Sequence, residues 1–196
     1  MSIAPRRLPR QQRGQRRVSG LLRAAASVIG EAGYERATMS AIAERAESSI
    51  GSLYQFFPNK ESVIEALRAQ YVKELEKLWS RLAAEAVSLT VEKLVTRLIS
   101  TQIEFAERHP AFLALLDAPR TANSTQRREI IRGRIARLIL ARQRAMSRNE
   151  ALRLAAVVQQ ILKGLLTLYA RAENGERAAI RDEFEDVLTG YLAAKL

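Results

Sequence analysis

The chain of 196 residues contains no cysteine and only one histidine, His109. A protein without cysteine has no disulfide, no thiolate metal ligand and no cysteine nucleophile. A single histidine argues against a histidine-built metal centre, and the carboxylates form no recognisable acid–base or metal-binding pattern. A glycine-rich phosphate loop is also missing. We therefore predict that the protein is not an enzyme and that it binds no metal and no cofactor.

Long apolar runs are missing as well. The longest are a handful of residues, well short of the ~20 that a membrane-spanning helix needs. Residues 1–17 are basic, but no apolar segment follows them as it would in a secretory signal peptide. These absences predict a soluble, cytoplasmic protein that has no membrane partner.

Positive charge is present in excess, with 32 Lys and Arg against 21 Asp and Glu, a formal net charge of +11. Residues 1–60 hold ten Lys or Arg and only four Asp or Glu, so they carry six of the eleven surplus charges. Surplus positive charge favours polyanions through counterion release. Residues 1–15 combine arginine with two prolines and no acid, which predicts a basic disordered arm. Such an arm is expected to help bind a polyanion, and the alternative is a tail that only keeps the protein in solution.

Apolar residues recur at helical spacing along the chain, and no segment alternates with a period of two over a useful length. Residues 18–29 predict a first helix, which Gly33 closes. Two short helices follow, and Asn59 caps a long helix over about residues 60–86. Helical spacing continues to the C-terminus. We therefore predict an all-α fold with about nine helices.

The two short helices are joined by a tight turn and follow a supporting helix. This is the layout of a helix-turn-helix, whose second helix enters the major groove of DNA. Ile42, Leu53 and Phe57 are spaced to form the small core that holds the two helices together. Residues 16–61 are therefore predicted to form a DNA-binding domain.

Residues 37–61 resemble the signature of the TetR family of bacterial transcriptional regulators. The shared features are Thr38, the Ile42-Ala43 pair, a Ser-x-Gly-x-Leu-Tyr-x-x-Phe core over 49–57, and Lys60-Glu61. The resemblance implies an N-terminal three-helix domain that binds DNA. It also implies that residues 62–196 form a helical domain for ligand binding and dimerisation.

Each predicted DNA contact has a physical reason. Gly51 permits close approach to the DNA backbone, while Tyr54 and Lys60 are suited to phosphate contacts. The resemblance implies that five further residues face the groove, among them Gln55, which can pair with adenine, and Ile50, which can meet a thymine methyl. The full predicted set is Arg16, Arg17, Thr38, Ser40, Ser49, Ile50, Gly51, Ser52, Tyr54, Gln55 and Lys60. For any one polar residue, simple solvation is the alternative.

The turn departs from the family pattern. Family members usually have glycine and then an aliphatic residue where this chain has Glu47 and Ser48. Glu47 is therefore expected either to adopt a left-handed backbone conformation or to shift the turn.

The last two helices are predicted to form a homodimer interface. The helix that follows Ser147 is apolar nearly all round, and a helix of this kind must be buried on most sides. The resemblance implies that two helices from each subunit pack together. The predicted interface residues are Leu154, Val158, Ile161, Leu165, Phe184, Val187, Leu188 and Tyr191. Burial within a monomer is the alternative.

Three polar residues on otherwise apolar stripes, Gln102, His109 and Arg142, indicate a ligand pocket. The alternative is internal bonding, with Asp117 or Glu104 as partners. If Arg142 lines the pocket, an anionic ligand is expected, and the polar residues amid apolar stripes suit an amphipathic one.

Together these features predict a homodimeric repressor that binds a palindromic operator in double-stranded DNA and leaves it when a small-molecule effector binds. The alternative is an architectural protein that coats DNA without an effector. An enzyme is a further alternative, and turnover of a substrate would reveal it.

Overall fold

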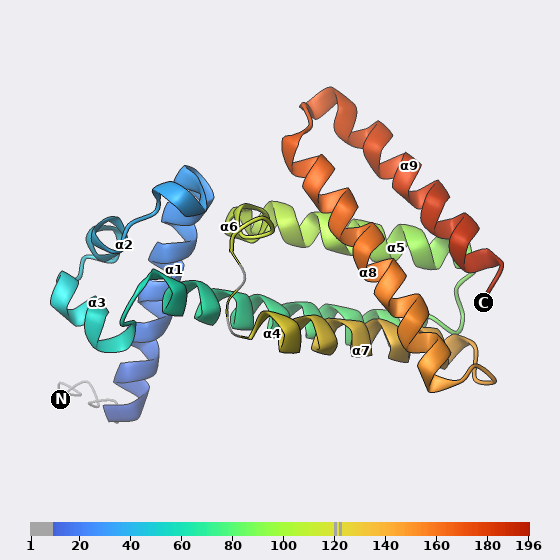
Figure 1. Cartoon of the computed structure of the whole chain (residues 1–196), viewed down its shortest axis with the longest axis horizontal. Coiled ribbons are helices and arrows are strands. Elements are labelled where there is room, and N and C mark those ends of the chain that lie inside the picture. The colour runs from blue at the N-terminus through green and yellow to red at the C-terminus, as the bar shows by residue number, and fades with distance from the viewer. Residues whose placement is uncertain (1–9, 120, 122) are drawn as a thin grey trace, which may run out of the picture.

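Figure 1 shows the computed structural model, which describes residues 10–119, 121 and 123–196. These residues form nine α-helices and no strand, which confirms the predicted all-α fold. The helices are α1 (Arg10–Arg36), α2 (Met39–Arg45), α3 (Ile50–Phe56), α4 (Lys60–Glu85), α5 (Val91–Arg108), α6 (Pro110–Ala114), α7 (Ser124–Arg142), α8 (Arg148–Arg171) and α9 (Asn174–Ala193).

Helix α1 begins earlier than predicted. The predicted disordered arm over residues 1–15 is wrong for residues 10–15, which are helical, while residues 1–9 lie outside the described residues. The reason is that arginine and glutamine are good helix formers and no proline follows Pro9 in this stretch. At the other end Gly33 interrupts the helix as expected, with φ 79° and ψ 166°, and one more turn follows it.

Two apolar cores share helix α4, and α5 also contributes residues to both. The first core joins α1, α2, α3 and the first half of α4, and it also includes Phe105, Ala111 and Leu115 from the α5–α6 region. The second core joins the rest of α4 with α5, α7, α8 and α9. In Figure 1, α4 extends from the small bundle of α1, α2 and α3 along the length of the larger bundle. Helix α4 is thus a continuous connection between the two cores and contributes buried residues to both.

By length and composition, α8 is long and apolar enough to cross a membrane, contrary to the expectation from apolar run length. Eight of its residues are buried in this fold, and it packs against α5, α7 and α9. One apolar face of α8 is therefore part of the core of this fold.

Helix α6 touches the small bundle at Gly30 of α1. A Cβ atom placed at Gly30 would lie 3.1 Å from Cβ of Pro110 and 3.3 Å from the backbone nitrogen of Ala111. By contrast, a Cβ atom at Gly20 in the same helix would have no neighbour closer than 3.9 Å. Glycine at position 30 therefore permits the close packing of α1 on α6.

We expect Gly30→Ala and Gly20→Ala to have different effects on the free energy of unfolding. Alanine is preferred over glycine inside a helix by about 0.5–1 kcal/mol, so Gly20→Ala should stabilise the protein by about that amount. At position 30 the same gain is offset by overpacking against α6, which costs about 1–3 kcal/mol. Urea unfolding of both variants measures the difference, and equal gains would contradict the close packing.

Candidate functional site

Helices α2 and α3 are each capped by a predicted DNA-binding residue. The Thr38 hydroxyl accepts a hydrogen bond from the Ala41 amide at 3.1 Å, and the Ser49 hydroxyl accepts one from the Ser52 amide at 3.2 Å. Such caps satisfy amides that have no partner in the first helical turn. Both hydroxyls therefore define where these short helices begin.

The outer face of α3 carries four of the predicted contacts. Ile50, Gly51, Tyr54 and Gln55 are exposed, whereas Leu53 on the opposite face is fully buried. A Cβ atom at Gly51 would meet no atom of the chain within 4 Å, so the fold itself does not require glycine there. Ser40 is likewise exposed, on α2. Leu53 is buried with Ile42 and Phe57, which confirms the predicted small core.

Arginines of α1 lie beside this face. Arg17 donates hydrogen bonds to the hydroxyls of Ser48 at 2.8 Å and Ser52 at 3.3 Å. Arg13 and Arg16 are exposed and, with Arg17, line a shallow hollow against α2. The sequence analysis placed Arg13 in the predicted basic arm, whereas the structure places it on α1.

Lys60 has internal partners. Its ammonium group donates to the backbone oxygen of Glu35 at 3.2 Å and lies 4.2 Å from the centre of the Tyr34 ring. It thereby joins the start of α4 to the end of α1. Its predicted phosphate contact stays a prediction.

The turn between α2 and α3 contains the expected unusual backbone. Glu47 has φ 48°, in the left-handed region, and this is the first of the two alternatives that the sequence left open. The Glu47 amide donates to the Glu44 oxygen at 2.9 Å, and the Ser48 amide donates to the Ala43 oxygen at 2.9 Å. The turn geometry is therefore retained at the cost of strain at a side-chain-bearing residue.

An ion pair orients α2 against α1. The Arg45 guanidinium donates to both carboxylate oxygens of Glu31, at 2.6 and 2.8 Å, and the Ser27 hydroxyl donates to the same carboxylate at 2.7 Å. The hydrogen bond from Arg45, followed by that from Ser27, lowers the pKa of Glu31 to about 2. Because this pair is solvent-exposed, its main effect is on orientation rather than on stability.

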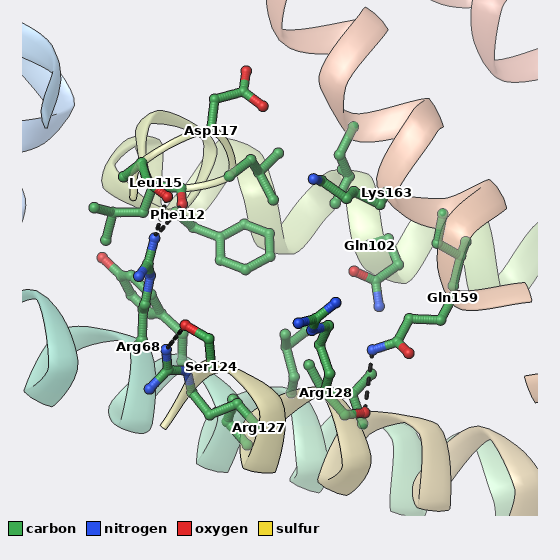
Figure 2. A pocket seen from close by; sticks show the side chains of 18 of the residues that line it. Arg68, Gln102, Phe112, Leu115, Asp117, Ser124, Arg127, Arg128, Gln159 and Lys163 are labelled. Atoms are coloured by element: carbon green, nitrogen blue, oxygen red, sulfur yellow. Dashed lines mark hydrogen bonds between the residues drawn. The ribbon is translucent and has the colours of Figure 1, made fainter. Parts of the chain in front are cut away.

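A cavity of about 670 Å³ lies where the two cores meet. Its walls come from α4, α5, α7 and α8 and from the segment around α6 (Figure 2). Of the three residues predicted to line a pocket, Gln102 is in the wall, with only 4% of its surface exposed. This volume falls within the range of ~300–1,000 Å³ typical of small-molecule sites.

His109 and Arg142 do not line this cavity, so the structure corrects their predicted position. The His109 ring stacks on Phe105, and its Nε2 lies 3.2 Å from a carboxylate oxygen of Glu74. The Arg142 guanidinium donates to the backbone oxygens of Ala86, at 3.1 Å, and Leu89. Both side chains therefore bond within the protein, which was the alternative to lining a pocket. Their partners are not Asp117 or Glu104, the two that the sequence analysis suggested.

Four cationic side chains reach the cavity wall, and sequence reasoning identified none of them individually. Arg68 donates to the backbone oxygens of Leu115, Ala118 and Pro119 at 2.9 to 3.1 Å. Arg127 bonds to Glu65, Thr121 and Ser124. Among the described residues no carboxylate pairs with the other two, Arg128 and Lys163. The one-turn spacing of Arg128 from Ile131, which also lines the cavity, was a usable signal.

The predicted interface on α8 and α9 needs correction. Leu154, Val158, Leu165 and Leu188 are buried within the chain's own core, as the alternative held. Ile161, Phe184 and Tyr191 are partly buried against that core. The exposed apolar side chains are Val157 at 41%, Leu168 at 50% and Val187 at 56% of their surface. Helix α8 is apolar all round because one face enters this core and another stays uncovered.

Comparison with known proteins decides the family. Residues 21–67 match the family model for bacterial regulatory proteins of the tetR family, and residues 90–192 match that for the tetracyclin repressor-like C-terminal domain. The chain belongs to the TetR family. It is therefore a TetR-family transcriptional regulator, as the resemblance implied.

Relatives agree with this assignment. The present chain is 26% identical over 176 residues to an HTH-type transcriptional regulator of Mycobacterium tuberculosis. The match covers 88% of this chain and 92% of that protein. The chain is 36% identical over 61 residues to the HTH-type transcriptional repressor KstR of Rhodococcus jostii, covering 31% of this chain and 27% of that one. FadR of Bacillus subtilis, solved in complex with stearoyl-CoA, has the same fold, with a TM-score of 0.71, 14% identity, and coverage of 88% of this chain and 98% of FadR.

We expect Glu47→Gly to be more stable than Glu47→Ala by about 1 kcal/mol. A left-handed conformation costs an L-residue about 1–2 kcal/mol, a cost that glycine avoids and alanine retains, while the entropy of glycine offsets part of the gain. Both variants remove the same negative charge near the predicted DNA face, so their affinities for DNA should rise equally. Thermal unfolding and DNA titration check both statements, and equal stabilities would contradict the strain at this turn.

Proposed function

We propose that this regulator is a homodimeric repressor that binds a palindromic operator and leaves it when a small molecule enters the cavity. The observation that carries the proposal is the position of the cavity at the junction of the two cores, with α4 running from the helix-turn-helix through its wall. A small molecule that binds there contacts the element that holds the DNA-binding helices.

The exposed face of α3 is proposed to enter the major groove. Gln55 and Ile50 read base edges, Tyr54 donates to a phosphate, and Gly51 allows the DNA backbone to approach. Arg13, Arg16 and Arg17 add charge on the flank of the same face. The arginines strengthen binding to any sequence, whereas α3 provides the sequence preference.

The exposed faces of α8 and α9 are proposed to form the dimer interface. Val157 and Leu168 on α8 and Val187 on α9 are apolar and uncovered in a single chain. Two-fold pairing of this surface with its copy covers them and presents two α3 helices to two half-sites. This proposal keeps the two helices and Val187 of the interface that was predicted from the sequence, and it adds Val157 and Leu168.

Effector release needs no chemistry. It needs only a ligand whose affinity differs between the DNA-competent arrangement and another arrangement. The cavity wall includes Tyr71 and Leu75 of α4 and Leu115 next to α6, and all three also belong to the core of the DNA-binding bundle. The complex of FadR with stearoyl-CoA supports a small-molecule role for this fold. We also place the protein in the cytoplasm, where bacterial DNA lies.

Selection from a random duplex pool, followed by titration of the selected duplex, tests operator recognition. We expect Gln55→Ala to lose about 1–3 kcal/mol of discrimination at one base pair of each half-site, because one bidentate base contact is removed. Gln126→Ala, at an exposed glutamine on α7, serves as the matched control and should bind as the wild type does. If no duplex is preferred over bulk DNA, the protein is an architectural DNA-coating protein instead.

Sedimentation of Leu168→Glu and Val187→Glu tests the interface. Both side chains are exposed in a single chain, so we expect either variant to fold as a monomer, because a dimer would bury an unpaired charge. Ile130→Glu changes a 37% exposed apolar residue of α7, which is not part of the proposed interface, and should remain dimeric. Dimers of all three variants would contradict the proposed interface.

A further inference from the structure

The cavity has two cations without an ionic partner. Arg128 rises from α7 and Lys163 reaches from α8 toward the same space in Figure 2. Both side chains are largely exposed, which places them at the entrance rather than in the deep wall. No carboxylate among the described residues lies within ion-pair distance of either one. Their charges are available to a ligand.

The other charged groups of the wall are already engaged. Arg68 holds the backbone oxygens at the end of α6, and Arg127 is paired with Glu65. Asp117, the carboxylate in the wall, pairs with Arg171 at 2.9 Å. The net charge offered to a ligand is therefore positive and comes from Arg128 and Lys163.

The rest of the wall is mostly apolar, with Leu75, Leu162 and Leu166 among its residues. Within it lies the Gln102 amide, which makes no hydrogen bond in the described part of the chain although the residue is only 4% exposed. Two other polar atoms of wall residues, the Tyr71 hydroxyl and Trp79 Nε1, are fully buried and have no hydrogen-bond partner among the described residues. Polar groups in this state are costly unless a bound molecule satisfies them.

From these three observations we infer that the effector is an anionic amphiphile with an oxygen atom on its apolar part. Arg128 and Lys163 bind its carboxylate or phosphate at the entrance, the leucines cover its chain, and Gln102 hydrogen-bonds to the hydroxyl or carbonyl oxygen inside. This inference rests on the proposed function, because it takes the cavity to be the effector site.

Trp79 provides a direct readout, since it is the one tryptophan of the sequence and lines the cavity. Its fluorescence is followed while the full-length protein is titrated, below micelle-forming concentrations, with four ligands of equal chain length. These are dodecanoate, dodecyl phosphate, dodecanol and dodecyltrimethylammonium. We expect one or both anions to bind about tenfold or more tightly than the alcohol, because a charge-assisted bond is lost with the alcohol, and the cation to bind weakest.

Variants assign the preference to the named residues. Arg128→Gln and Lys163→Gln should each weaken anion binding about tenfold and leave dodecanol binding unchanged. Arg137→Gln, at an exposed arginine of the same helix outside the cavity wall, is the matched control and should behave as the wild type does. Melting temperatures show whether each variant is folded. An anion preference that survives both substitutions would overturn the inference.

Gln102→Leu tests the interior contact. In the wild type, at least one member of a series of hydroxydodecanoates should bind more tightly than dodecanoate itself, and this advantage should disappear in the variant. Plain dodecanoate should bind the variant equally well or better, because its chain then no longer covers an amide that has no partner. If no hydroxylated ligand binds the wild type more tightly than dodecanoate does, the inferred contact between Gln102 and a ligand oxygen is wrong.

Failure of this inference is distinguishable from failure of the proposed function. One outcome is that the protein selects a palindromic duplex, an uncharged molecule releases the protein from that duplex, and anions do not bind. This outcome would support the repressor proposal and contradict the anionic effector. If no duplex is preferred, the repressor proposal falls, whereas the Trp79 titrations still decide which ligand charge the cavity accepts.

Discussion

The continuity of α4 through two apolar cores is the constraint on which the rest of this structure depends. Ile64 and Leu67 are buried with the helix-turn-helix, and Trp79 and Leu82 are buried with the larger bundle. A helix packed at both ends cannot shift at one end without disturbing contacts at the other, because protein interiors are close-packed. The cavity opens beside the middle of this helix, where the two cores meet. The proposed effector cavity and the helix-turn-helix are thus separated in space but joined by α4.

The arginines of this basic chain have different physical roles. Arg17 bonds to Ser52 of α3, Arg13 and Arg16 line the neighbouring hollow, and all three side chains are exposed. Arg68 and Arg127 are internal, since each holds backbone or side-chain oxygens around the α6–α7 connection. A net charge of +11 therefore overstates the charge available to DNA.

Local features were predictable because they depend on neighbours in the sequence. The capping of α2 by Thr38 and the end of regular helix at Gly33 follow from short-range rules, and the structure has both. The left-handed backbone at Glu47 is one of the two alternatives that the sequence left open. Helical spacing and the Asn59 cap likewise identified the long helix α4. Periodicity failed on α8, because a helix that is apolar all round does not indicate which face enters its own core.

The sequence by itself determined the all-α class, the helix-turn-helix and the family, because these depend on spacing within about 45 residues. Only the tertiary structure decided which cations are free. Arg142 and Arg128 belong to the same arginine-rich helix, yet the first reaches the backbone oxygens that follow α4 and the second faces the cavity. That difference depends on the residues that face each side chain, and these residues are far away in the sequence. The same reason explains why Leu154 is interior and Leu168 is exposed.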